Sequence, residues 1–148
     1  MRIALAHAPF HDAIDDVVAG RLKAGRATQL VSVHSFNPVY KGVRRPWHIG
    51  IIHDDDRRLA APLIAALETM AITVGINQPY SPADRVYYTL ERHARSRGLP
   101  CAMIEIRNDE IEDIGQQKEW AGRLAGIFAA MRIGPTRAKT TELDGLAL

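Results

Sequence analysis

Short apolar runs alternate with helical patterns along this chain of 148 residues, and that alternation limits the folds it can adopt. The clearest run starts at Leu30 and reads Leu-Val-Ser-Val-His-Ser-Phe-Asn-Pro, which predicts a buried strand followed by a polar loop. Three more strands are predicted over residues 47–52, 72–76 and 99–107. Helices interleaved with short apolar strands favour an α/β fold, a layered α/β/α domain with a mixed, mostly parallel sheet.

Apolar residues recur at helical spacing in four segments. The first helix is predicted to begin at Pro9 and to end before Gly25, and the others cover residues 59–70, 87–97 and 120–131. The first two predicted strands follow one another with no helix between them, so antiparallel pairing of these two is also open. The spacing leaves the order of the strands in the sheet undetermined.

The composition is that of a single globular domain. Hydrophobic residues make up 47% and charged residues 24%, which excludes disorder for the body of the chain. We interpret residues 1–135 as one domain and residues 136–148, which show no clear period, as a C-terminal tail. The net charge is only +2 and its cations are dispersed among acidic residues, which argues against a nucleic-acid partner. With no apolar run near ~18 residues and no signal-peptide pattern, we expect a cytoplasmic protein without a membrane partner.

Chemically active side chains lie near the ends of two predicted strands. His34 ends the first strand, where open α/β sheets place their ligand sites. Glu105 and Arg107 occupy alternate positions near the end of the last strand, so they share one face. A strand facing solvent would show the same alternation. However, an ionised carboxylate is costly in a sheet covered on both faces unless it is paired or lines a cleft.

The loop after the first strand carries two arginines, Arg44 and Arg45. A guanidinium can bind a carboxylate through two parallel hydrogen bonds, so the pair would suit a substrate that bears a carboxylate. A solvated surface pair accounts for these arginines equally well. His7 and His11 lie four residues apart, a spacing compatible with a metal on a helix. Because no glutamate lies between them, we predict two partly exposed helix histidines instead.

Five segments, in their order and spacing, form a specific pattern: His34-Ser-Phe-Asn-Pro-Val, Gly42-Val-Arg-Arg-Pro-Trp-His-Ile-Gly, Asn77-Gln-Pro-Tyr-Ser, Tyr88-Thr-Leu-Glu-Arg-His and Ile104-Glu-Ile-Arg-Asn-Asp. The pattern resembles the carboxyl-terminal half of the N-formylglutamate amidohydrolase family. The resemblance covers residues 9–132. It implies a fold like that of the zinc carboxypeptidases. It also implies hydrolysis of an N-formyl or N-acyl amino acid to formate and L-glutamate, a reaction of histidine degradation.

The resemblance also implies roles for individual residues. It makes His34 a zinc ligand and Glu105 the general base that activates water. It places Arg44, Arg45, Tyr88, Arg107 and Asn108 around the substrate, and we also predict His48 and His93 as substrate-binding residues.

Family members carry further residues on the amino-terminal side that supply the other zinc ligands, and we expect this chain to lack that region. A catalytic zinc normally has three protein ligands and an open position, and His34 is the one ligand identified. No other residue falls in a family position that could replace the missing zinc ligands, although His48, His53 and His93 could be recruited in space. Three hypotheses follow. The chain is a truncated amidohydrolase, a catalytically inactive domain that binds a small carboxylate, or a subunit of a homo-oligomer that completes its zinc site with another chain.

Overall fold

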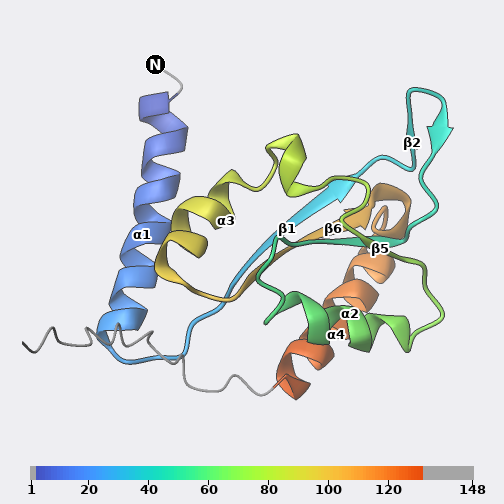
Figure 1. The fold of residues 1–148 in the computed structure, drawn as a ribbon. Coiled ribbons are helices and arrows are strands. Elements are labelled where there is room, and N and C mark those ends of the chain that lie inside the picture. Colours follow the sequence, from blue (N-terminus) through green and yellow to red (C-terminus); the bar gives the residue numbers. More distant parts are fainter. Residues whose placement is uncertain (1–2, 132–148) are drawn as a thin grey trace, which may run out of the picture.

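A four-stranded sheet lies at the centre of the computed structural model, which describes residues 3–131 (Figure 1). The strand order is β1-β6-β4-β5. β1 (Leu30–Phe36) and β6 (Cys101–Arg107) are parallel, as are β4 (Ile49–Ile52) and β5 (Val74–Ile76), whereas β4 is antiparallel to β6. The mixed, mostly parallel sheet predicted from the sequence is therefore confirmed.

The strand order settles the pairing that the sequence left open. β6 lies between β1 and β4, so the first two long strands of the chain do not pair with each other. β4 and β5 run in the direction opposite to that of β1 and β6. The carboxyl ends of β4 and β5 therefore lie at the other end of the strands from the carboxyl ends of β1 and β6. The loop after β5 turns back across the sheet, so that the Gln78 carbonyl lies against Gly50 of β4.

Two layers of helices cover the sheet (Figure 1). α1 (Ala8–Lys23) and α3 (Tyr88–His93) lie on one face, and α2 (Ala60–Glu68) and α4 (Ile114–Ala130) on the other. The remaining elements are short: a π-helical turn (Ile3–His7), a hairpin of β2 (Val39–Tyr40) and β3 (Val43–Arg44), and three 3-10 turns (Pro82–Asp84, Arg95–Arg97 and Asn108–Glu110). No helix among residues 3–131 is long and apolar enough to cross a membrane.

Successive side chains of β6 point to opposite faces of the sheet, and each face has its own hydrophobic core. Cys101 and Met103 pack with Val18 of α1 and Leu90 of α3, whereas Ile104 and its alternate neighbours pack with α2 and α4. β6 is thus buried on both faces, as strands in a covered sheet usually are. Its one charged residue before the final arginine is Glu105, which lies on the α1 and α3 face.

α4 begins earlier than its apolar spacing predicts. The helix starts at Ile114 because Asp113 and Gln116 form a capping box, in which each side chain accepts from the other residue's backbone N–H. The first turn carries polar residues, so the apolar pattern alone finds only the part from residue 120 onwards. The predicted tail, residues 136–148, lies outside the described residues.

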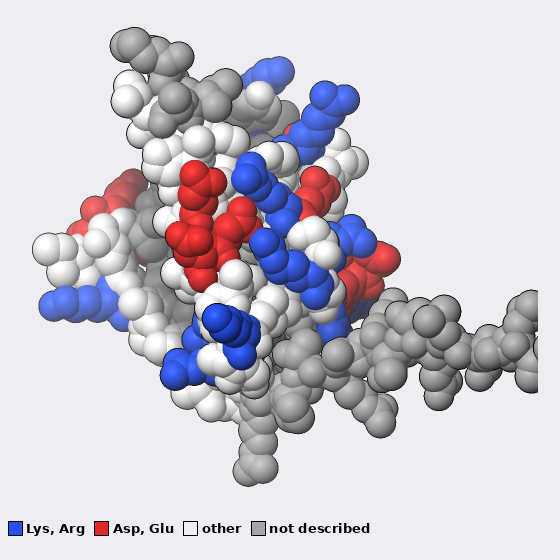
Figure 2. Space-filling model, turned by 90° about the vertical axis from the view of Figure 1, so that its left-hand side faces the viewer, with Lys and Arg blue, Asp and Glu red and all other residues white. Residues whose placement is uncertain are grey.

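On the face of the molecule that carries α1, acidic and basic side chains lie next to one another (Figure 2). Asp15 of α1, for example, is paired with Arg97, whose Nη2 lies 2.6 Å from the carboxylate.

Candidate active site

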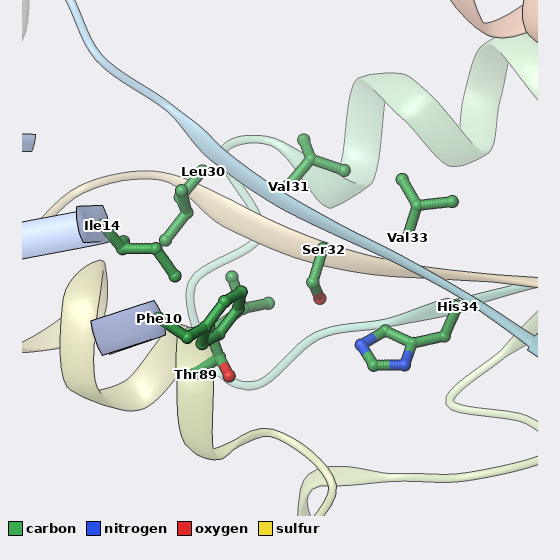
Figure 3. Close-up of a pocket in the computed structure, with 9 residues that line it drawn as sticks. Phe10, Ile14, Leu30, Val31, Ser32, Val33, His34 and Thr89 are labelled. Atoms are coloured by element: carbon green, nitrogen blue, oxygen red, sulfur yellow. The ribbon is translucent and has the colours of Figure 1, made fainter. Parts of the chain in front are cut away.

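His34 and Glu105 lie side by side at the same level of two parallel strands. They are paired positions in the β1–β6 register, so their side chains leave the sheet on the same face. Figure 3 shows the His34 ring on the same side of β1 as Ser32, facing the region of Phe10 and Thr89. His34 is exposed, whereas Glu105 is only 4% exposed. The sequence predicted each residue separately, and the strand pairing brings the two together.

The Glu105 carboxyl is buried without full hydrogen bonding. Its Oε2 atom has no hydrogen-bond partner among the described residues. Burial raises the pKa of Glu105 from 4.5 to about 7, and the nearby positive charge of Arg45 partly opposes that rise. A carboxyl group that titrates near neutral pH can both accept and release a proton, as a general base requires.

Arg45 is held beside this carboxyl by aromatic rings. Its guanidinium lies 4.6 Å from the ring of Tyr40 and 4.9 Å from the ring of Tyr80. It donates one hydrogen bond, to the Tyr80 hydroxyl at 3.3 Å, and no other acceptor contacts it among the described residues. The remaining N–H groups are therefore free to bind an anionic substrate group. Arg44 is exposed on β3 and makes no such contacts within residues 3–131.

Arg107 supports the loop that carries Arg45. Its guanidinium forms ion pairs with Asp109 at 2.6 Å and Glu110 at 3.1 Å. It also donates to the backbone carbonyls of Arg45, Pro46 and Trp47. With these contacts its donors are largely used, so Arg107 positions the Arg45 loop rather than presenting a free guanidinium.

Two other predicted site residues, Asn108 and His48, bind neighbouring segments of the chain. Asn108 donates to the Asn37 side chain at 2.7 Å, which joins the ends of β6 and β1. His48 accepts through Nδ1 from the backbone of Thr73, and its Nε2 lies 3.8 Å from Glu110. Neither contact involves Glu105 or His34.

His93 lies in a buried chain of polar side chains that connects α3 with α1. It is fully buried, and it lies 2.6 Å from His11 through Nε2 and 2.8 Å from Asp15 through Nδ1. Tyr88 is about half exposed and packs edge-on against the His11 ring, at 5.4 Å between centroids. The prediction of two partly exposed helix histidines is wrong for His11, which is buried because α3 packs over it. His7 is exposed.

Three further side chains lie at this site that the sequence did not predict. Ser32 lies on the same face of β1 as His34, and its hydroxyl is buried without a partner among the described residues. Tyr40 and Tyr80 hold Arg45, although the motif around residue 77 already included Tyr80. Alternation along β1 could have singled out Ser32 as a polar side chain on the His34 face.

A cavity of about 470 Å³ lies next to His34, between β1, α1 and α3 (Figure 3). Its polar lining residues are His34, Ser32 and Thr89, and the rest of the lining is apolar.

The described residues do not make up a complete zinc site. Among residues 3–131, no group of three or more His, Cys, Asp or Glu side chains is arranged to hold a metal ion. A catalytic zinc usually needs three protein ligands, and His34 supplies at most one of them. Zinc therefore stays a prediction for this chain.

Comparisons with known proteins identify a family and a similar solved structure. Residues 1–112 match the sequence model of a family described as N-formylglutamate amidohydrolase. The crystal structure of a gene product from Agrobacterium tumefaciens is similar, with a TM-score of 0.80 and 44% sequence identity over 87% of this chain. The match covers 51% of the Agrobacterium chain, so this chain spans about half the length of that relative. No curated protein is significantly similar in sequence.

Proposed function

Because the chain belongs to the N-formylglutamate amidohydrolase family, we propose that it forms part of a hydrolase acting on N-formyl or N-acyl amino acids. The observation that carries the proposal is the pairing of His34, which lines the cavity, with Glu105, a buried carboxyl that has an unsatisfied oxygen. The reaction breaks the amide C–N bond. With N-formyl-L-glutamate as substrate, water adds to the formyl carbon, and formate and L-glutamate are released.

In this proposal Glu105 moves the proton. Its carboxylate accepts a proton from the attacking water, and the same proton is then donated to the nitrogen that leaves. The pKa of about 7 suits both steps, since the group is substantially ionised at neutral pH and still basic enough to take a proton. Such positioned proton transfer contributes typically ~10²–10⁴-fold to a rate.

Arg45 provides the contact that holds the substrate. Its free N–H groups would bind a carboxylate of the amino acid, and the rings of Tyr40 and Tyr80 fix the guanidinium plane for that purpose. Arg107 acts indirectly, because it holds the backbone of the Arg45 loop through three carbonyl groups.

We propose His34 as one ligand of a zinc ion. Since the described residues supply no complete ligand set, the other ligands would come from residues beyond them or from another chain.

The test is formate release from N-formyl-L-glutamate in the presence of added zinc. Replacing Glu105 by Gln keeps the shape of the side chain but removes the base, so we expect at least a ~100-fold loss of rate. Glu112→Gln is the matched control, because Glu112 is exposed and lines none of the cavity next to His34, and it should keep the wild-type rate. Equal rates for Glu105→Gln and wild type would remove Glu105 from the mechanism.

A further inference from the structure

A second cavity, of about 300 Å³, lies between the β2–β3 hairpin and the loop after β5, and Arg45 is part of its lining. It shares no lining residue with the cavity next to His34. Ligand pockets usually measure ~300–1,000 Å³, so this cavity has room for a small group such as one side chain. A substrate carboxylate held by Arg45 would bring the rest of the amino acid next to this cavity.

The register of the hairpin decides which side chains form the cavity wall. Tyr40 pairs with Val43, and Val39 pairs with Arg44. Paired residues of antiparallel strands share a face, and successive residues point to opposite faces. Tyr40 and Val43 therefore lie on one face, together with Arg45, whose guanidinium lies 4.6 Å from the Tyr40 ring. Arg44 borders the cavity, but its side chain leaves the hairpin on the other face, with Val39.

The opposite wall is apolar and held in place by the sheet. It is formed by Trp47 and Pro79, together with Gln78. The Trp47 ring packs so closely on β5 that a Cβ atom at Gly75 would lie 2.8 Å from its Cγ. A Cβ atom at Gly50 of β4 would likewise lie 3.3 Å from Cδ of Pro79. Both rings thus rest on strand backbone, which makes this wall preformed.

The cavity has one fixed cation and no carboxylate in its lining. Arg45 is fixed by the Tyr40 and Tyr80 rings. Lys41, by contrast, is exposed at the hairpin turn on a flexible, strongly hydrated side chain. One guanidinium matches one carboxylate. A second carboxylate, as in glutamate, would enter an apolar space without a fixed partner, which is unfavourable.

We propose that this cavity holds the side chain of the substrate, and that the preferred substrate is an N-formyl amino acid with a large apolar side chain rather than N-formyl-L-glutamate. The inference rests on the proposed function, in which Arg45 binds the substrate carboxylate. A hydrophobic pocket can discriminate roughly tenfold or more for a single methylene group, so the preference is large enough to measure.

The experiment compares N-formyl-L-phenylalanine, N-formyl-L-glutamate and N-formylglycine with the full chain. Isothermal titration calorimetry gives the three dissociation constants, and formate release with added zinc gives kcat/KM. We expect N-formyl-L-phenylalanine to bind at least ~tenfold tighter than either of the other two compounds. N-formylglycine has the same carboxylate without a side chain, so it measures the contribution of Arg45 alone.

Val43→Lys introduces a second cation on the cavity wall beside Arg45. It should lower the ratio of phenylalanine to glutamate affinity at least ~tenfold, because the second carboxylate then gains a partner. Val39→Lys is the matched control. Both valines are exposed and lie on the same hairpin, but Val39 is on the face away from the Tyr40 ring. The control adds the same charge and should change the ratio less than twofold. Circular dichroism of both variants establishes that the chain still folds.

The proposal is overturned if N-formyl-L-glutamate binds as tightly as N-formyl-L-phenylalanine, if none of the three compounds binds, or if the two lysine variants have equal effects. Failure of the proposed function gives a different result. A tenfold preference in binding without formate release from any compound would support the cavity's role and contradict the hydrolysis. Formate release from N-formyl-L-glutamate without a preference for phenylalanine would do the reverse.

Discussion

At the scale of single residues, burial of the Glu105 carboxyl has a cost in stability. Its carboxyl has a pKa of about 7 in the folded chain against 4.5 as its ordinary value, so the folded state holds the proton more tightly. Below about pH 4.5 the carboxyl is protonated in both states and the cost is absent. Above about pH 7 ionisation disfavours folding by about 3 kcal/mol, at about 1.4 kcal/mol for each pKa unit.

Replacing Glu105 by Gln should therefore stabilise the chain while it removes the base. We expect the free energy of unfolding of Glu105→Gln to exceed that of wild type by up to about 3 kcal/mol at pH 8, and to differ little at pH 4. Urea unfolding at the two pH values measures this difference. A Gln variant no more stable than wild type at pH 8 would show that the carboxyl is better solvated than its burial indicates.

The residues of the site differ in how far the sequence could define them. The resemblance identified His34 and Glu105 singly, and Arg45 as half of an arginine pair. The resemblance could not show that Arg45 and Arg107 differ in their contacts. The Arg45 guanidinium keeps free N–H donors, whereas the N–H donors of Arg107 bind Asp109, Glu110 and backbone carbonyls. That difference depends on which acceptors lie within about 3 Å after folding, and acceptors distant in sequence leave no local pattern.

At the scale of elements, the end of the sheet near Glu105 depends on one glycine of β4. Gly50 is paired with Glu105 across the β4–β6 ladder, and the loop after β5 crosses directly over it. A Cβ atom at this position would lie 1.9 Å from the Gln78 carbonyl oxygen, which is backbone and cannot rotate away. The absence of a side chain at residue 50 therefore lets the loop pass beside the strand position that pairs with Glu105.

We expect Gly50→Ala to destabilise the chain strongly, by about 2 kcal/mol or more, because strand and loop must move apart. Gly122→Ala is the matched control. Gly122 lies within α4, and nothing lies within 4 Å of the added Cβ, so this change should stabilise by about 0.5–1 kcal/mol through helix propensity. Thermal unfolding of both variants measures the contrast. A tolerated Gly50→Ala would mean that the loop does not cross the strand so closely.

At the scale of the whole molecule, the α1 layer is attached through a buried polar chain. Asp15 of α1 binds His93 of α3, and His93 contacts His11 of α1. The groups that face His11 are His7, Arg92, His93, Asp15 and the Tyr88 ring. Burial is the main reason that the pKa of His11 is lowered, and the positive charges of its neighbours add to this effect.

A lowered histidine pKa means that the folded state favours neutral imidazole. His11 thus contributes its full stabilisation above about pH 6.5 and loses it as the pH falls below that value. We expect the stability difference between wild type and His11→Ala to be largest at pH 8 and to shrink towards pH 5. The difference is the quantity to compare, because Glu105 changes the total stability in the opposite direction over this range.

Lys23→Ala is the control for this measurement. Lys23 is exposed at the end of α1 and is not among the groups that face His11, so its removal should change stability little at either pH. A His11→Ala difference that stays constant between pH 8 and pH 5 would show that His11 does not titrate in the folded chain.

The sequence by itself determined the family and the alternation of helices and strands, and it predicted His34 and Glu105 as site residues. These depend on local periodicity and on motifs that lie within short segments, which are readable along the chain. Only the tertiary structure decided the strand order, the neighbourhood of His34 and Glu105, the different contacts of Arg45 and Arg107, and the burial of His11. Each of these depends on segments far apart in sequence that meet only when their apolar faces pack together, so no local pattern encodes them.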